Sequence, residues 1–277
     1  MPVSKAELTG GITAGYDDEG HGTSVVLVHG HPFDRTMWQP QVRHLARGGH
    51  RVLAPDLRGY GTSTVVPGKT TLETFARDLA ALLDRQEPDG ADGVVLGGLS
   101  MGGQIVMEFL RLFPERVRAL VLADTSAPAE SAAGRRERLA TADRLEREGM
   151  GPYAEEVLDR MVTPQNQRDL PEVAGHVRRM MHDAPPEGAA AALRGRAERP
   201  DYTATLRAAR VPALVVVGEE DAFTPLADAR LLHDALAGSE LVVVEGAGHL
   251  PNLERPEAFN AALDAFLARL PRPAETV

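Results

Sequence analysis

The sequence predicts an α/β protein built on a mostly parallel central sheet flanked by helices. Short, nearly continuous apolar runs alternate with longer segments of helical periodicity, which is the pattern of consecutive strand–helix–strand units. Runs that are apolar at every position are typical of strands covered by helices on both faces. One long segment without strand signal interrupts the alternation, and we expect it to form a helical insertion, or lid.

Six short runs of Val, Leu and Ala are expected to be the strands. They are nearly continuous rather than alternating, as expected when helices cover both faces of a parallel sheet. The expected strands cover residues 25–28, 52–54, 94–96, 119–122, 214–217 and 241–244.

Three segments carry apolar residues at helical spacing. Thr70 and Glu73 have the spacing of a capping box at the start of the first segment. Pro114 ends the second, because proline cannot continue a helix. The apolar positions are Leu72, Phe75, Leu79, Leu82 and Leu83; Ile105, Val106, Phe109, Leu110 and Phe113; and Phe259, Leu263, Phe266 and Leu270.

Residues 127–200 make up the segment without strand signal. Pro164, Pro171, Pro185 and Pro186 divide it into short helical pieces. We expect residues 1–126 and 201–277 to form one core domain, with 127–200 as a cap over the strand ends. Within the cap we expect the alanine run 189–192 to be helix surface and the basic stretch 135–138 to be a solvated helix face.

Apolar cap side chains could form part of a pocket wall. For any single one of them, however, we expect a gap-filling role between the cap helices and the sheet. The side chains considered are Met150, Met161, Met180, Met181 and Leu193.

The composition argues against several classes of function. A formal net charge of −10 disfavours nucleic-acid binding, because phosphates would be repelled. The absence of cysteine excludes disulfides and thiolate chemistry. The first residues lack an apolar signal region and no stretch approaches a membrane span, so we expect a cytoplasmic protein without a membrane partner. The oligomeric state is left open.

The segment Gly98-Leu99-Ser100-Met101-Gly102 carries the strongest chemical signal. It lies directly after an expected strand and directly before an expected helix, which is the context that a G-x-S-x-G turn requires. Such a turn holds its central residue in a strained backbone conformation, so that the hydroxyl projects above the sheet. The helix that follows supplies partial positive charge for an incoming oxyanion. Ser100 is therefore the candidate nucleophile.

His249 is the candidate general base, since a serine hydroxyl needs a base to remove its proton. Among nine histidines, it lies in a short loop directly after the last expected strand. Active sites of open α/β sheets gather at that carboxyl edge. For the histidines on expected helices, in early turns or in the insertion, we expect structural hydrogen bonds instead.

Two aspartates could orient the base and stabilise its imidazolium form. Asp221 follows the expected strand 214–217, and Asp124 follows the expected strand 119–122, so both open onto the same edge of the sheet. The chain order of nucleophile, acid and histidine is satisfied by either residue. The residues alone therefore leave both open.

Two backbone N–H groups are expected to hold the oxyanion. One belongs to Met101, the residue after the nucleophile, and the second to His31 in the loop after the strand 25–28. His29 and His31 also form an H-x-H pair, but a zinc site needs three or four ligands, and no further cluster follows at useful spacing. The glycines near Ser100 do not match G-x-G-x-x-G. We expect neither a metal nor a cofactor.

Taken together, these segments resemble the α/β-hydrolase superfamily, in order and over nearly the whole chain. The matching segments are His29-Gly30-His31-Pro32, Asp56-Leu57-Arg58-Gly59-Tyr60-Gly61-Thr62-Ser63, Gly98-Leu99-Ser100-Met101-Gly102-Gly103, Gly218-x-x-Asp221 and Gly248-His249. The resemblance implies the α/β-hydrolase fold. It favours Asp221 over Asp124, because the acid of these enzymes more commonly follows the penultimate strand. Serine at position 100 disfavours the haloalkane dehalogenases and epoxide hydrolases, whose nucleophile is aspartate.

Within the superfamily, the chain is similar to small bacterial aryl esterases and 3-oxoadipate enol-lactonases, partly through residues 113–117 and 252–259. This implies a serine hydrolase that cleaves a small-molecule carboxylic ester or lactone through an acyl-enzyme, with no cofactor. Two alternatives stay open. The same triad could hydrolyse a C–C bond or a thioester, or carry out perhydrolysis, since the lid shape decides among these. The second alternative is a ligand-binding protein of the same fold that catalyses no reaction.

Overall fold

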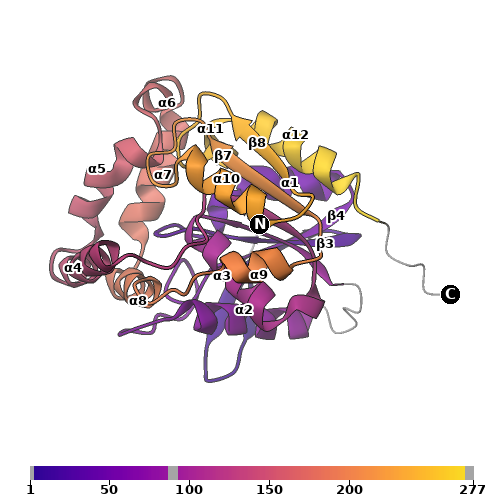
Figure 1. Cartoon of the computed structure of the whole chain (residues 1–277). Helices are drawn as coiled ribbons and strands as arrows, with labels where there is room; N and C mark the ends of the chain where they lie inside the picture. Colours follow the sequence, from indigo (N-terminus) through magenta and orange to yellow (C-terminus); the bar gives the residue numbers. More distant parts are fainter. Residues whose placement is uncertain (1–2, 87–92, 272–277) are drawn as a thin grey trace.

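The computed structural model describes residues 3–86 and 93–271 and shows one twisted sheet with helices on both faces (Figure 1). The strand order is β1-β2-β4-β3-β5-β6-β7-β8, and every pair from β4 to β8 is parallel. The strands are β1 (Ser4–Glu7), β2 (Thr13–Gly20), β3 (Thr23–Val28), β4 (His50–Pro55), β5 (Val94–Leu99), β6 (Val117–Ala123), β7 (Ala213–Gly218) and β8 (Glu240–Val244). The predicted α/β fold and all six predicted strands are confirmed.

Two strands, β1 and β2, were not predicted. Both pair antiparallel, β1 with β2 and β2 with β4, at one end of the sheet. Their side chains are only partly buried, and the second half of β2 reads Asp-Asp-Glu-Gly. Neither strand therefore contains the continuous apolar run that marks a strand buried on both faces.

The central strands supply two separate apolar cores. In β3, Val26 and Val28 lie in the core under one face, while Val25 and Leu27 lie in the core under the opposite face. The period of two along a strand produces this division and explains why the runs are apolar throughout. Side chains of α2 (Leu72–Gln86), α3 (Met101–Leu112), α9 (Thr203–Ala208) and α10 (Leu226–Ala235) join the first core, and those of α1 (Gln39–Arg47) and α12 (Pro256–Leu267) join the second.

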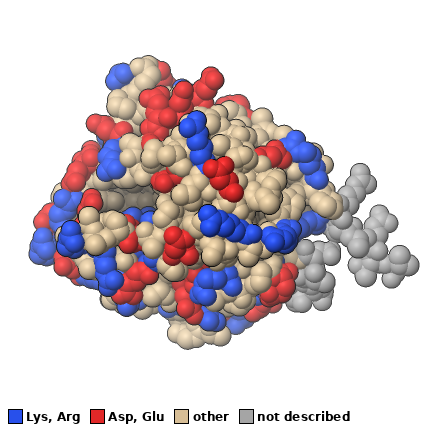
Figure 2. Space-filling view, in the orientation of Figure 1, with Lys and Arg blue, Asp and Glu red and all other residues tan. Residues whose placement is uncertain are grey.

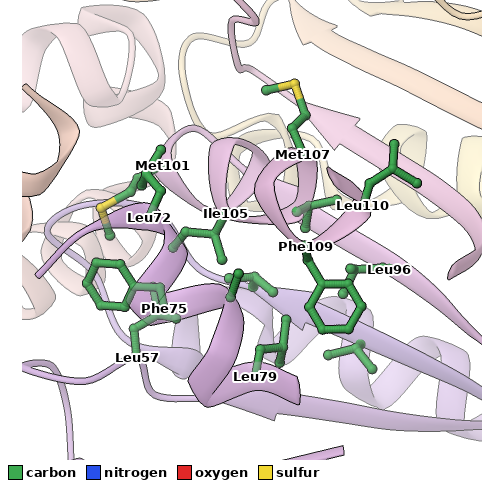
Figure 3. Close-up of a cluster of buried hydrophobic side chains, with 14 of the residues drawn as sticks. Leu57, Leu72, Phe75, Leu79, Leu96, Met101, Ile105, Met107, Phe109 and Leu110 are labelled. Atoms are coloured by element: carbon green, nitrogen blue, oxygen red, sulfur yellow. The ribbon is translucent and has the colours of Figure 1, made fainter. Parts of the chain in front are cut away.

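Figure 3 shows the first core between α2 and α3. Phe75 and Leu79 of α2 face Ile105 and Phe109 of α3, and all four are almost fully buried. The α2 helix begins one residue later than a capping box at Thr70 would require. Its capping residue is Thr71, whose Oγ1 accepts from the N–H of Thr74 at 3.1 Å, so the predicted Thr70–Glu73 capping box is wrong.

Five of the six helices between β6 and β7 cover one end of the sheet (Figure 1). They are α4 (Ala132–Glu148), α5 (Met150–Met161), α6 (Pro164–Asp169), α7 (Pro171–Asp183) and α8 (Pro186–Arg196). Proline opens α6, α7 and α8, as expected where a first-turn N–H has no helical partner. None of the helices in the described part of the chain is long and apolar enough to cross a lipid bilayer.

The alanine run of α8 is not helix surface. Ala189, Ala190, Ala191 and Ala192 are fully buried, because α8 packs against both α4 and α2. The carbonyl of Ala191 also accepts a hydrogen bond from the N–H of Thr70 at 3.0 Å. Small side chains are required at these four positions because the backbone of α8 lies close to the backbone of the loop before α2.

Candidate active site

Ser100 lies at the turn between β5 and α3 with a φ of 56° and a ψ of −115°. A non-glycine residue in this region of backbone space is strained, and such strain is typical of functional turns. The turn closes because its flanking glycines lack Cβ atoms: a Cβ on Gly98 would lie 2.4 Å from the backbone of Gly102, and a Cβ on Gly102 would lie 2.1 Å from the carbonyl oxygen of Val28. The G-x-S-x-G pattern is thus a steric requirement of this turn.

His249 follows β8 and contacts Asp221, which follows β7. The Nδ1 atom of His249 lies 2.9 Å from each carboxylate oxygen of Asp221, and both side chains are almost completely buried. Nδ1–H therefore donates to the carboxylate, which leaves Nε2 with a free lone pair. This is the arrangement that a general base needs.

The Asp221 carboxylate is held in the ionised form. Burial alone would raise the pKa of Asp221, but the His249 imidazole and the Thr224 hydroxyl lower it to about 2. The N–H of Phe223 also donates to Oδ1 at 2.8 Å. The ring of Phe223 lies against the His249 imidazole, with 4.9 Å between the ring centres. The loop after β7 therefore provides both the carboxylate that binds His249 and an aromatic ring that covers it.

Asp124, the second candidate acid, is buried beside the same pair but in a different state. Its Oδ1 accepts from the N–H of Gly218 at 2.8 Å, and its Oδ2 has no hydrogen-bond partner among the described residues. Burial raises the pKa of Asp124 well above its ordinary value, and the charge of Asp221 raises it further. Asp124, Asp221 and His249 bring ligand-type atoms within 4.8 Å of one another. The raised pKa of Asp124 works against the deprotonated form that a metal ligand needs.

The backbone of Gly30, the residue before His31, lies beside Ser100. A Cβ on the neighbouring Gly30 would lie 3.3 Å from the Cβ of Ser100. Among the described residues, neither the N–H of His31 nor that of Met101 has a hydrogen-bond acceptor. The side chain of Met101 points into the core between α2 and α3 (Figure 3), so this residue offers only its backbone to the site.

The two loop histidines have different surroundings. His29 is fully buried, with Nδ1 donating to the carbonyl of Gly30 at 2.8 Å and Nε2 accepting from the N–H of Leu57 at 3.0 Å. Both ring nitrogens are used, as expected of a structural histidine. His31 contacts the hydroxyl of Tyr60 through Nδ1 at 2.7 Å, and burial together with Arg196 lowers the pKa of His31 well below its ordinary value.

Ser100, His31 and His249 line one cavity of about 260 Å³, which the helices between β6 and β7 close from the other side. Of the apolar side chains considered for its wall, Met161 and Leu193 line it, whereas Met150, Met180 and Met181 are buried in the packing cores. The complete lining is His31, Ser100, Gln104, Ser126, Glu130, Arg138, Tyr153, Met161, Leu193, Arg196, Arg199, Phe223, Thr224, Asp228 and His249.

A second cavity of about 270 Å³ shares part of this lining and lies between α4 and α5. Figure 2 shows the molecule hollowed on this side, between the helical segment and the sheet domain, with Lys and Arg atoms at the rim. The shared wall residues are Glu130, Arg138, Tyr153, Leu193 and Phe223. The two cavities are therefore adjacent and share one wall.

Sequence reasoning missed three polar residues around the site: Tyr60, Arg196 and Glu254. Glu254 is buried and binds the backbone on both sides of His249. The expectation of a solvated basic stretch is wrong for Arg138, which lines the cavity and pairs with Glu130, although its neighbours on α4 are exposed. No pattern distinguishes Arg138 or Arg196 from the other arginines, since the fold alone decides which of them faces inward.

Known proteins share the sequence features and the fold described above. A family model described as "Alpha/beta hydrolase family" matches residues 25–262. The chain is 31% identical to 3-oxoadipate enol-lactonase 2 of Acinetobacter baylyi over 84% of each protein. Among solved structures, a malate-bound thermophilic esterase of Thermogutta terrifontis has a TM-score of 0.93 at 41% identity, covering 98% of this chain and 99% of the esterase. The enol-lactonase of Burkholderia xenovorans has a TM-score of 0.87 at 29% identity, covering 96% of this chain and all of that one.

These matches span the sheet, the turn at Ser100 and the loops that carry Asp221 and His249. The resemblance inferred from the motifs is therefore confirmed, and the chain belongs to the alpha/beta hydrolase family.

Proposed function

We propose that this protein is a serine hydrolase that cleaves small carboxylic esters or lactones through an acyl-enzyme. The observation that carries the proposal is the contact of His249 Nδ1 with both oxygens of Asp221 at 2.9 Å, beside the strained Ser100 in one cavity. The relatives named as esterases and enol-lactonases support the same class of reaction.

The first half of the reaction forms the acyl-enzyme. Nε2 of His249 takes the proton of Ser100 as its Oγ attacks the substrate carbonyl. The backbone N–H groups of Met101 and His31 stabilise the oxyanion, and losing one such donor typically costs about 10²–10³ in rate. His249 then protonates the leaving alcohol, while Asp221 stays ionised because its pKa is about 2.

The second half releases the acid. His249 removes a proton from a water molecule, which attacks the acyl carbonyl and restores Ser100. Nothing in these steps requires a cofactor or metal. The neutral Asp124 takes no direct part, because a protonated carboxyl cannot compensate the imidazolium charge.

We assign residues 127–200 as the cap and residues 1–126 with 201–277 as the hydrolase core. The helices α4 to α8, which lie between β6 and β7, support this division, and they supply Arg138, Tyr153, Met161 and Leu193 to the cavity. The cap would then determine which substrates fit, while the core carries the reacting groups.

Steady-state hydrolysis of p-nitrophenyl esters of increasing acyl length, beside simple lactones, tests the proposal. We expect turnover by the wild type, best with short acyl chains because the cavity is only about 260 Å³. The variant Ser100→Ala should lose about 10⁶-fold in kcat and keep its fold. A rate within tenfold of wild type for a folded Ser100→Ala protein would reject the assignment.

A further inference from the structure

Three arginines and two acids line the cavity that contains Ser100 and His249. Glu130 is shared by two of the arginines, pairing with Arg138 and lying 3.4 Å from Arg199. The second acid is Asp228. Three guanidinium groups therefore face two carboxylates in this lining, and the ionised Asp221 lies behind it, bound to His249.

Arg196 is the arginine of this set that has no acidic partner. It is only 7% exposed, and its one hydrogen bond is from Nε to Oε1 of Gln104 at 3.1 Å. Within residues 3–86 and 93–271, no carboxylate lies within ion-pair distance of it, and neither Nη nitrogen has an acceptor.

A buried guanidinium without an anion is costly, because it loses its hydration without a compensating charge. Burial and the charges of Arg138 and Arg199 work against the positive charge of Arg196 and lower its pKa well below the ordinary value. Arginine nevertheless remains protonated in proteins. A bound anion in the cavity would relieve this imbalance.

Arg196 is connected to Ser100 through hydrogen bonds of Gln104. Gln104, which binds its Nε, lies one helical turn beyond Ser100 on α3, and the N–H of Gln104 donates to the carbonyl of Ser100 at 3.2 Å. One turn of α-helix rises about 5.4 Å. Ser100 and Arg196 also line the same cavity, so an anion bound by the free Nη groups would lie in the cavity that contains the reacting serine.

We propose that Arg196 is the counter-ion for a carboxylate carried by the substrate, so that this protein acts on small esters or lactones that bear one carboxylate. The planar guanidinium presents two parallel N–H donors, which match a carboxylate in a bidentate contact. This inference rests on the proposed hydrolase function.

A pair of stable methyl esters with the same four-carbon acyl chain tests it. Methyl butyrate is neutral and monomethyl succinate carries a carboxylate, and the acid released from each is titrated at constant pH. We expect wild-type kcat/KM to be at least about tenfold higher for monomethyl succinate, as for a hydrogen-bonded charged group. Equal values, or a preference for methyl butyrate, overturn the inference.

Substitutions of Arg196 and Arg194 test whether Arg196 causes the preference for the charged ester. Arg196→Gln should lower the ratio of kcat/KM for monomethyl succinate to kcat/KM for methyl butyrate by about 30-fold. Arg194→Gln on the same helix is the matched control, because Arg194 binds Asp143 and Glu146 at the surface. Its two kcat/KM values should stay within about twofold of wild type. An equal loss on both esters in a folded Arg196→Gln protein contradicts the inference.

Inhibition of the wild type provides a measurement that does not depend on the folding of a variant. Butyrate should inhibit methyl butyrate hydrolysis competitively and at least about tenfold more strongly than butyramide, because only butyrate can pair with Arg196. Equal inhibition overturns the inference even if Arg196→Gln does not fold. Hydrolysis of neither ester by the wild type would instead reject the proposed hydrolase function.

Discussion

The carboxylate of Glu254 accepts a hydrogen bond from the N–H of Gly248 at 2.9 Å, one residue before His249. Its second oxygen accepts from the N–H of Thr163 at 3.0 Å and from the side-chain amide of Asn166 at 2.7 Å. Thr163 and Asn166 belong to the start of α6. One buried carboxylate therefore joins the loop of the candidate base to the helices between β6 and β7.

Glu254→Gln should weaken both the fold and the reaction. The amide group of Gln would face N–H donors on one side and leave them unsatisfied, so we expect the free energy of unfolding to fall by about 2–4 kcal/mol. Displacement of His249 should lower kcat about tenfold or more. Denaturant unfolding and ester hydrolysis measure the two effects. The exposed Glu257 gives a matched control, since Glu257→Gln should change stability by less than about 0.5 kcal/mol.

Replacing each buried aspartate by asparagine should separate their roles. Asp221→Asn removes the charge that orients His249 and should cost about 10⁴ in kcat. Asp124→Asn imitates the neutral carboxyl already present and keeps an acceptor for Gly218, so kcat should remain within about tenfold of wild type. Hydrolysis rates of the two variants check this, and a larger loss for Asp124→Asn would mean that the acid has been misassigned.

The two aspartates should also affect stability with opposite dependence on pH. The pKa of Asp221 is about 2 in the folded protein, below its value of about 3.9 in an unfolded chain. Its contribution is therefore complete above about pH 4 and is lost as the pH falls towards 2. The difference in unfolding free energy between wild type and Asp221→Asn should shrink over this range in denaturant titrations, if the protein stays folded there.

For Asp124 the sign is reversed, because its folded pKa is raised. The unfolded chain releases this proton above about pH 4 whereas the folded protein retains it, so the wild type loses stability as the pH rises. Asp124→Asn lacks this proton. The stability of Asp124→Asn relative to wild type should therefore increase as the pH rises above about 4. A difference that is independent of pH would show that Asp124 is ionised in the folded state.

Close packing of α8 can be tested with two helical glycines. A Cβ on Gly195 would lie 1.7 Å from the carbonyl oxygen of Thr70, whereas a Cβ on Gly175 of α7 would meet only Arg179 Nη1 at 3.5 Å. Gly195→Ala should therefore destabilise the protein by about 1–3 kcal/mol or more, as in an overpacked core. Gly175→Ala should stabilise it by up to about 1 kcal/mol, because alanine favours helix. Thermal unfolding of the two variants measures this difference. Equal shifts in Tm would contradict the close packing of α8 against the loop at Thr70.

Much of the fold was predictable from local pattern. Strands such as β3 and β7 contain continuous apolar runs because they are buried on both faces, and the prolines at 164, 171 and 186 mark the starts of α6, α7 and α8. Strands β1 and β2 lack that pattern because they are partly exposed. The position of the α2 cap at Thr71 was missed because Thr70 and Thr71 are adjacent and only their backbone conformation decides between them.

The candidate triad was identifiable because each member follows a recognisable strand. The loops after β5, β7 and β8 open onto one edge of a parallel sheet, so Ser100, Asp221 and His249 could be expected to meet there. Arg196 could not be identified in this way. It differs from the partly buried Arg194 only in the direction that α8 gives its side chain, and that direction depends on long-range packing.

Covalent labelling with a p-nitrophenyl phosphonate tests the central claim, the nucleophilic role of Ser100, most directly. Peptide mass spectrometry should find one phosphonyl group per chain, on Ser100, with release of one equivalent of p-nitrophenol. His249→Ala should label at least about 10³-fold more slowly, because the serine loses its base, and Ser100→Ala should not label at all. A hydrolytically active protein labelled at another residue, or equally labelled in Ser100→Ala, would contradict the account.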